Sequence, residues 1–317
     1  MADFTDVRKV RLGASARTSE GERGSIAEVI VAQATGAAQG VGVRFGAFGK
    51  TVYATFDHVV SGNEDEITLD IPRSAFQSAA PSGTRLSAGT HVTLDGKRVG
   101  RLAHITFEAA TRKPLRLVVE RGAGAVAIPA SAISGITEKG LELTSGRNGS
   151  MATLAPYHPD SELRQDIREA IERYARMQVD IAGVDIQAVD GVVWLRGHVS
   201  SELNRRMIQD ITSGVPGVAD LHSEMIPDPA LAANISAALA RDPATAEEHI
   251  GVYPTLGRVF LRGVVKAPTA REAASRIAAT GHGAREVINE LRVNPNASVL
   301  PEMAGVTGGE DIVPGGQ

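Results

Sequence analysis

The sequence predicts a multidomain chain in which two small antiparallel β-barrels precede two α+β sandwiches of element order α-β-β-α-β. Three observations lead to this fold class. The C-terminal half repeats itself at an offset of 66 residues, the N-terminal half repeats more faintly at offsets of 76 and 74, and helical periodicity is nearly absent before Pro159. With 317 residues, of which 43% are apolar, the chain is long enough to build several separate cores.

The C-terminal repeat has the same order of elements in both units. A period of 3.6 residues marks two helices, and Asp190-Gly191 marks a tight turn between two apolar strands. In the first unit the expected elements are a helix from Asp160 or Ser161, strands at 184–188 and 192–199, a helix at about 201–212 and a strand at 218–226. The side chains expected to face the core from the helices are Leu163, Ile167, Ala170, Ile171, Leu203, Met207, Ile208 and Ile211.

The motifs of these units resemble the BON domain family. The shared pattern is a leading helix, a strand pair split at a glycine, a Val-x-Leu-x-Gly strand, a helix and a terminal strand opened by Gly217-Val218 in the first unit. The resemblance covers 160–227 and 228–294, and the second unit departs from it at Gly283-Ala284 and at Pro254 in its first hairpin. It implies two small sandwiches with both helices on one sheet face, in a family that occurs in envelope-stress proteins, potassium sensors and secretin rings.

The N-terminal repeat is built from alternating strands. Gly24 aligns with Gly100 and Val59 with Ile133, and Asp95-Gly96 predicts a hairpin turn. Its second copy resembles a PRC-barrel, through Asp-Gly-x-x-Val-Gly from Asp95 and Ile128-Pro129 before a short helical turn. We therefore expect a degenerate PRC-barrel-like domain at 1–80, a second one at 81–147 and a linker at 148–159. Relatives of this kind are commonly adaptors to ribosomes, membrane complexes or other proteins.

The ends and the composition of the chain predict its location. The N-terminus has no secretory pattern, and no apolar run reaches the length of a membrane-spanning helix, so a cytoplasmic location is expected. Residues 295–317 contain Gly and Pro but no basic residue and are expected to form a flexible tail. With no cysteine, disulfides and thiolate chemistry are excluded.

No motif predicts catalysis, a metal or a cofactor. The stretch Gly122–Ala127 matches a dinucleotide fingerprint, but it runs into Pro129 instead of a helix, so a hairpin turn is the favoured interpretation. The eight histidines lack metal-ligand spacing and are expected to be scattered on the surface. Without a paired acid, base or nucleophile, the chain is not expected to be an enzyme.

The remaining candidates are surfaces for interaction. Trp194 and Phe260 hold equivalent places and are expected in the cores. Arg196 and Arg262 are expected to point to the opposite sheet face from the neighbouring leucines. Acidic against basic residues number 12 against 7 in 161–228 and 6 against 8 in 229–294. The candidate interaction residues are Arg196, Arg258, Arg262, Lys266, Arg271 and Arg276.

These charges predict a homo-oligomer as the main assembly. Opposite net charge favours a head-to-tail contact between unlike BON units, which closes into a ring or continues as a filament. The predicted function is a non-enzymatic scaffold or adaptor, with another protein as a further partner and no nucleic acid. Three alternatives stay open: binding to an anionic phospholipid surface, a stress-related role, and sensing of potassium or a small ligand.

Overall fold

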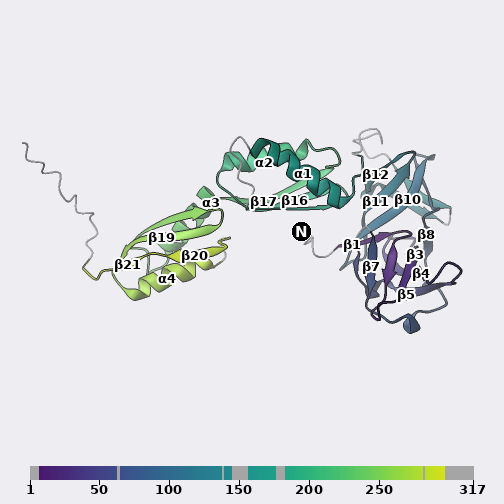
Figure 1. Ribbon diagram of the computed structural model, residues 1–317, viewed down its shortest axis with the longest axis horizontal. Helices are drawn as coiled ribbons and strands as arrows, with labels where there is room; N and C mark the ends of the chain where they lie inside the picture. The colour runs from purple at the N-terminus through teal and green to yellow at the C-terminus, as the bar shows by residue number, and fades with distance from the viewer. Residues whose placement is uncertain are drawn as a thin grey trace, which may run out of the picture. The chain divides into compact units, whose positions relative to one another are not determined.

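The computed structural model describes residues 7–62, 65–137, 139–144, 156–175, 183–280 and 283–296. Most of the linker expected at 148–159 and of the tail expected at 295–317 lies outside these ranges. Figure 1 labels the helices and strands. The chain divides into two compact units. Unit 1 comprises 1–174, 186–195 and 209–223, and unit 2 comprises 175–185, 196–208 and 224–317.

The two N-terminal repeats form sheets of identical strand order. Repeat 1 has the order β5-β4-β3-β2-β7-β6, and repeat 2 has β12-β11-β10-β9-β14-β13. The strands of repeat 1 are β1 Val7–Arg11, β2 Ser15–Arg17, β3 Arg23–Val31, β4 Ala38–Arg44, β5 Thr51–Thr55, β6 Val59–Gly62 and β7 Glu66–Leu69. Those of repeat 2 are β8 Thr84–Ser87, β9 His91–Leu94, β10 Lys97–Glu108, β11 Pro114–Arg121, β12 Gly124–Pro129, β13 Ile133–Thr137 and β14 Gly140–Leu143.

The expected closed barrels are not confirmed. Among the described strands, no pairing joins the two ends of either order, β5 to β6 or β12 to β13, so each sheet is open. Short 3₁₀ turns stand at Phe56–His58, Arg73–Ala75 and Ala130–Ala132, and the last of these is the helical turn expected after Pro129. The strand repeat itself is confirmed, because β3 and β10, and likewise β7 and β14, hold equivalent places in the two orders.

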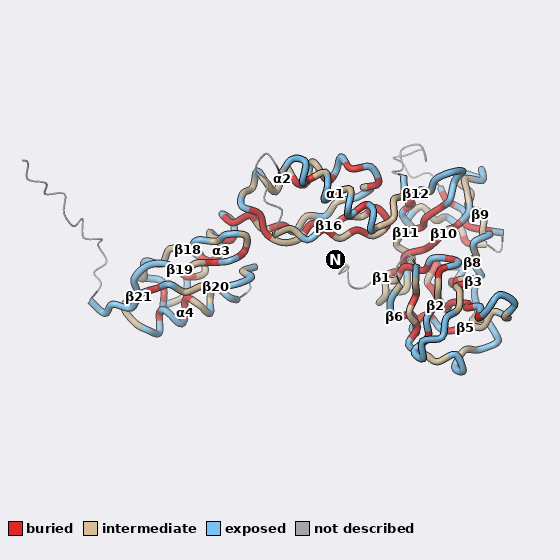
Figure 2. The backbone as a smooth tube through the Cα atoms, viewed as in Figure 1, coloured by how far each residue is buried: buried red, intermediate tan, exposed pale blue. Residues whose placement is uncertain are grey.

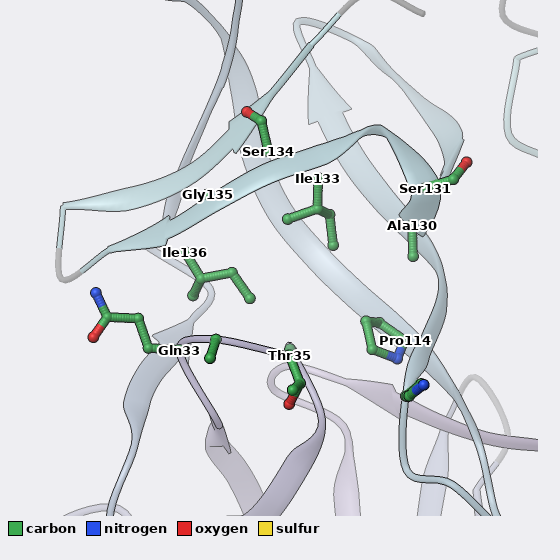
Figure 3. Close-up of a pocket in the computed structure, with 12 residues that line it drawn as sticks. Gln33, Thr35, Pro114, Ala130, Ser131, Ile133, Ser134, Gly135 and Ile136 are labelled. Carbon is green, nitrogen blue, oxygen red and sulfur yellow. The ribbon is translucent and has the colours of Figure 1, made fainter.

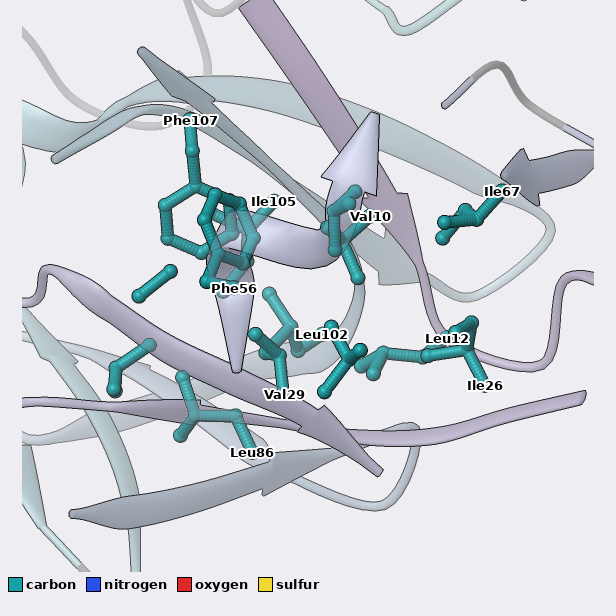
Figure 4. Close-up of a cluster of buried hydrophobic side chains, with 14 of the residues drawn as sticks. Val10, Leu12, Ile26, Val29, Phe56, Ile67, Leu86, Leu102, Ile105 and Phe107 are labelled. Carbon is teal, nitrogen blue, oxygen red and sulfur yellow. The ribbon is translucent and has the colours of Figure 1, made fainter. Parts of the chain in front are cut away.

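The repeats exchange one strand each. β1 pairs with β10 of repeat 2, with Val10 opposite Ile105, and β8 pairs with β3 of repeat 1, with Leu86 opposite Val29. As a result the buried side chains of both repeats form one hydrophobic core (Figure 4). Phe56 and Phe107, one from each repeat, lie in this core with ring centroids 5.1 Å apart. The two repeats are therefore held together as one packed body. Figure 2 shows the buried residues of both sheets in red.

The predicted hairpin turns have the backbone that their residues require. Asp95-Gly96 and Asp190-Gly191 both have positive φ at each residue, as a two-residue hairpin turn requires. The Gly122 segment is also a hairpin turn, with Arg121 opposite Gly124, as expected from the missing helix. Leu256-Gly257 adopts the same conformation without an Asn or Asp, which places a leucine at φ 48°.

The C-terminal half forms two α+β modules with the predicted order of elements. The first module contains α1 Asp160–Ala175, β15 Val184–Val189, β16 Val192–Val199, α2 Glu202–Ser213 and β17 Asp220–Pro227. The second contains α3 Asp228–Arg241, β18 His249–Thr255, β19 Arg258–Val265, α4 Pro268–Ala279, β20 Glu286–Asn289 and β21 Arg292–Val293. Their sheet orders are β15-β16-β17 and β18-β19-β20, with β21 paired to β19.

Helical periodicity predicted most of the buried side chains correctly. Leu163, Ile167 and Ile171 of α1 and Ile208 of α2 are fully buried. Ala170, Met207 and Ile211 are partly buried, whereas the prediction is wrong for Leu203, whose side chain is 66% exposed. It stands in the first turn of α2, at the end of the apolar stripe.

In the second module both helices cover one face of the sheet. Leu231 and Ile235 of α3 and Ala274 of α4 pack in one cluster with Val259 and Leu261 of β19. Because side chains alternate along a strand, Phe260, Arg262 and Val264 point to the other face. That face is covered by no element among the described residues of unit 2, and several of its side chains are exposed.

Candidate interaction surface

The uncovered sheet face of the second module carries an apolar row across three strands. Tyr253 of β18 stands opposite Phe260 of β19, and Phe260 stands opposite Ile288 of β20. Tyr253 is 53% exposed, although its residue type is usually at least half buried. Its ring lies over Gly251, where a Cβ would come within 2.6 Å of it. The row therefore presents flat aromatic surface to solvent.

An ion pair borders this row on each side. Nε of Arg258 lies 2.9 Å from Oε2 of Glu286, and Nε of Arg262 lies 2.6 Å from Oε2 of Glu290. Both guanidinium groups also lie over the Phe260 ring, at 5.7 and 5.4 Å from its centroid. The arginines thus lie along β19 and the glutamates lie on or directly after β20, with the aromatic ring between the two pairs.

The first module presents a related face. Trp194 and His222, equivalent to Phe260 and Ile288, have ring centroids 5.1 Å apart. Nε of Arg196 lies 2.9 Å from Oε2 of Glu224, which matches the Arg262–Glu290 pair. The expectation that Trp194 and Phe260 lie in the cores is wrong, because Val193 and Leu195 of β16 are the buried positions and both aromatics are only half-buried.

Comparison with known families identifies these modules. The family model of the BON domain matches the chain twice, over residues 159–226 and 227–295. The C-terminal half contains two BON domains. The match does not include the N-terminal repeats, whose resemblance to PRC-barrels stays a prediction.

Two solved structures show a low similarity to the chain. Both come from CdsD, described as a structural protein of the type III secretion system of Chlamydia trachomatis. One is 17% identical with a TM-score of 0.34, and the match covers 42% of this chain and 61% of that one. The other, a C-terminal domain, is 13% identical with a TM-score of 0.22 and covers 44% and 100%. At such scores the likeness supports no conclusion. A comparison with curated proteins finds no match.

The six candidate interaction residues do not form one patch. Arg258 and Arg262 lie on the open face of the second BON domain, whereas Arg271 and Arg276 lie on α4, which packs on the opposite face. Lys266 stands between β19 and α4, where its backbone N–H donates to the Glu248 carboxylate. Arg196 belongs to the first BON domain. The basic character counted along the second domain is therefore split between two faces.

A buried ionic cluster joins repeat 2 to the first BON domain inside unit 1. Nζ of Lys9, on the exchanged strand β1, lies 2.8 Å from both Oδ2 of Asp160 and Oδ1 of Asp190. Nε2 of His104 lies 2.7 Å from Oδ1 of Asp190, and the Thr106 hydroxyl donates to its Oδ2. Asp160, the first residue of α1, in turn accepts the backbone N–H of Asp190 at 2.8 Å. Side chains on β1 and β10 thus hold the Asp190-Gly191 turn of the first BON domain in place.

Burial and charge shift the pKa values of this cluster in different directions. Burial alone would lower the pKa of Lys9, but the carboxylates of Asp190 and Asp160 outweigh it and raise that pKa above its usual value. Burial would raise the pKa of Asp190, but His104 and Lys9 outweigh it and hold that pKa well below its usual range. For Asp160, burial prevails over Lys9 and raises the pKa. Lys9 and Asp190 therefore form a charged pair in the folded protein.

A second histidine contact joins the two BON domains within unit 2. With a proton on Nε2, His198 donates to the carbonyl oxygen of Gly283 at 2.6 Å. Its ring also lies against the turn at Gly257, where a Cβ would approach it within 2.6 Å. His104 and His198 are 2% and 6% exposed, so the prediction of scattered surface histidines is wrong for these two. Each lies against the first β-turn of the BON domain that follows it in the sequence.

Lys9, His104, Asp160 and Asp190 were not recognised as a cluster from the sequence. Lys9 is 151 residues from Asp160, and His104 is 86 residues from Asp190, so no local spacing connects them. The only local signals were Asp190 as a turn residue and Asp160 as a residue that can begin a helix. Among the described residues, no three His, Asp or Glu side chains are grouped to hold a metal ion.

A small pocket lies between the two N-terminal repeats (Figure 3). Its volume is about 290 Å³, and its walls include Gly36, Pro114, Ile133 and Ile136. Gly36 and Ser131 line the pocket, and their counterparts in the other repeat are Arg112 and Asp57. The side chains of Arg112 and Asp57 form an ion pair at 3.1 Å. Small residues therefore leave a pocket at one place, and an ion pair spans the equivalent place. It lies at the lower size limit of ligand sites.

No helix in the described part of the chain is both long enough and apolar enough to cross a bilayer.

Proposed function

We propose that this chain is a non-enzymatic scaffold that self-associates through its BON domains and displays its N-terminal repeats, as PRC-barrel-like modules, to partners. The observation that carries the proposal is the uncovered row of Tyr253, Phe260 and Ile288 between two Arg–Glu pairs. Aromatic residues and arginine are the types enriched in protein interfaces and their energetic centres. A second protein surface that excludes water from this row gains free energy from the apolar area it buries.

The shared core of the N-terminal repeats supports the adaptor part of the proposal. Exchange of β1 and β8 holds both repeats in one body, so they would be displayed together. Lys9 on the exchanged strand also holds the turn of the first BON domain. A rigid attachment of this kind suits a protein that presents surfaces in a fixed arrangement.

Light scattering on the intact chain tests self-association. Over a concentration series from micromolar to several hundred micromolar, at about 0.1 M salt where exposed charges act only over about 10 Å, we expect the mass to rise above the 33.2 kDa of the monomer. Negative-stain images then distinguish a ring or filament from a closed dimer. A monomer at every concentration up to several hundred micromolar contradicts the proposal.

Binding to anionic lipid is the rival role that the geometry disfavours. Such binding needs clustered cations, each contributing about 1 kcal/mol near the surface. Arg196, Arg258 and Arg262 each contact a glutamate, which offsets their charge. We expect no flotation of the protein with vesicles rich in phosphatidylserine at low salt. Flotation that high salt abolishes would establish the lipid role instead.

A further inference from the structure

We infer that the open face of the second BON domain binds the same face of a second copy, about a two-fold axis parallel to its strands. This inference rests on the proposed self-association and names the contact that produces it. The face consists of the apolar row Tyr253, Phe260 and Ile288 with the two bordering Arg–Glu pairs. We call this surface the BON2 face.

The charges of the BON2 face are arranged in two parallel columns. Arg258 and Arg262 lie on β19 and point to the same side, since they are separated by an even number of residues. Their partners Glu286 and Glu290 lie on or directly after the adjacent strand β20. Neighbouring strands are about 4.8 Å apart, so a positive column runs beside a negative one with the Phe260–Ile288 pair at mid-height.

This pattern is complementary to itself in one orientation. A two-fold axis that runs along the strands, between β19 and β20, turns the face over and exchanges the two columns. The arginines of one copy then oppose the glutamates of the other, and Phe260 of one copy opposes Ile288 of the other. An in-plane axis perpendicular to the strands would instead oppose arginine to arginine, which costs several kcal/mol in an interface.

The existing ion pairs do not prevent this contact. All four charged side chains are roughly half exposed, and exposed pairs of this kind contribute only about 0–1 kcal/mol. Arginine has five N–H donors, so each guanidinium can keep its glutamate and bind a carboxylate of the second copy. Phe260 and Ile288 supply burial, and the charges select the orientation.

The size of the face predicts a weak dimer. Three strands of about five residues cover roughly 14 by 17 Å in the sheet plane, which is far below the roughly 800 Å² per partner of a stable interface. Association is therefore expected to depend on concentration in the range of tens of micromolar and to weaken with salt.

The first BON domain does not have the same self-complementary pattern. Only the Arg196–Glu224 pair is repeated there, since Val192 and Asp220 stand where Arg258 and Glu286 stand in the second domain. With Asp185 also on that face, its charge is predominantly acidic, and two such faces repel. The net charges of the whole domains are opposite and predict a head-to-tail contact, but they include residues of the helices. In a sheet-to-sheet contact the helices lie on the far side of each sheet, where salt screens their charges.

Charge reversal tests the contact with the intact chain. R258E/R262E makes the BON2 face wholly acidic and E286R/E290R makes it wholly basic, so each variant alone should dimerise at least tenfold more weakly than the wild type by sedimentation velocity. An equimolar mixture of the two should form a heterodimer, and the quadruple variant, in which both columns are exchanged, should recover the wild-type affinity. R205E/R206E on α2 reverses the same number of charges away from the face and is the control.

The outcomes separate this inference from the proposed function. A wild-type chain that stays monomeric contradicts self-association itself. An oligomer that both face variants leave unchanged keeps self-association and overturns the BON2 contact. Loss of the oligomer in R258E/R262E without recovery in the mixture also overturns it, because the face would then bind a different surface, as a head-to-tail assembly requires. Circular dichroism of each variant checks that it folds.

Discussion

Replacing Lys9 by methionine tests the buried ionic cluster. Lys9→Met keeps most of the side-chain volume but leaves Asp190, which is completely buried, without the cation at 2.8 Å. Removing one partner of a buried ion pair costs about 3–5 kcal/mol, because the other charge stays buried without compensation. Since His104 and Thr106 still bind Asp190, we expect a loss near the lower end of this range.

Urea unfolding followed by Trp194 fluorescence measures this loss. Trp194 is the single tryptophan and lies in the same BON domain as Asp190, and urea, unlike guanidinium chloride, does not screen charges. Arg17→Met is the control, because it removes a cation from an exposed pair with Glu66 and should cost less than about 1 kcal/mol. Lys9→Met with Asp190→Asn removes both charges and should recover part of the stability. Equal losses for Lys9→Met and Arg17→Met would refute the reasoning.

The pH dependence of this effect has a defined direction. The lowered pKa of Asp190 means that its stabilisation is present above about pH 4 and is lost as the pH falls through its folded-state pKa. The raised pKa of Lys9 means that its stabilisation is present below about pH 10 and is lost as the pH rises through its own folded-state pKa. The difference between wild type and Lys9→Met should therefore be largest around neutral pH and decrease in strong acid.

Three further predictions concern the BON domains. Gly257→Ala should destabilise more than Gly96→Ala in thermal unfolding, since both have φ near 80° but only the first brings a Cβ into the His198 ring; equal shifts would exclude that contact. Asp228→Ala should cost about 1–2 kcal/mol in urea, because Asp228 accepts the backbone N–H of Leu256 at 2.9 Å, and an unchanged midpoint would contradict this. Hydrogen bonds from Arg205, and then from Arg206, hold the pKa of Glu202 at about 2, so Arg205→Ala should raise it toward about 4.3 in an NMR titration, whereas a value still near 2 would disprove the assignment.

The local pattern of residues was sufficient to predict the strands and helices and to detect both repeats. A strand or helix depends on neighbours a few residues away, so the predicted 192–199 strand coincides with β16, and the predicted helix at 201–212 lies within one residue of α2. The Asp95-Gly96 and Asp190-Gly191 turns were predictable for the same reason, because the residues themselves tolerate positive φ. Equivalent strands recur in β3 and β10 because the two segments carry similar apolar patterns.

The partners of these elements were decided only by the tertiary structure. Alternation along β16 predicts two faces but not which one the helices cover, so Trp194 was assigned to the wrong side. The exchange of β1 and β8, the burial of Lys9 and His104, and the pairing of Arg258 with Glu286 all join residues far apart in sequence. Their energies depend on burial and on distances between side chains, and these quantities exist only once the sheets have packed together.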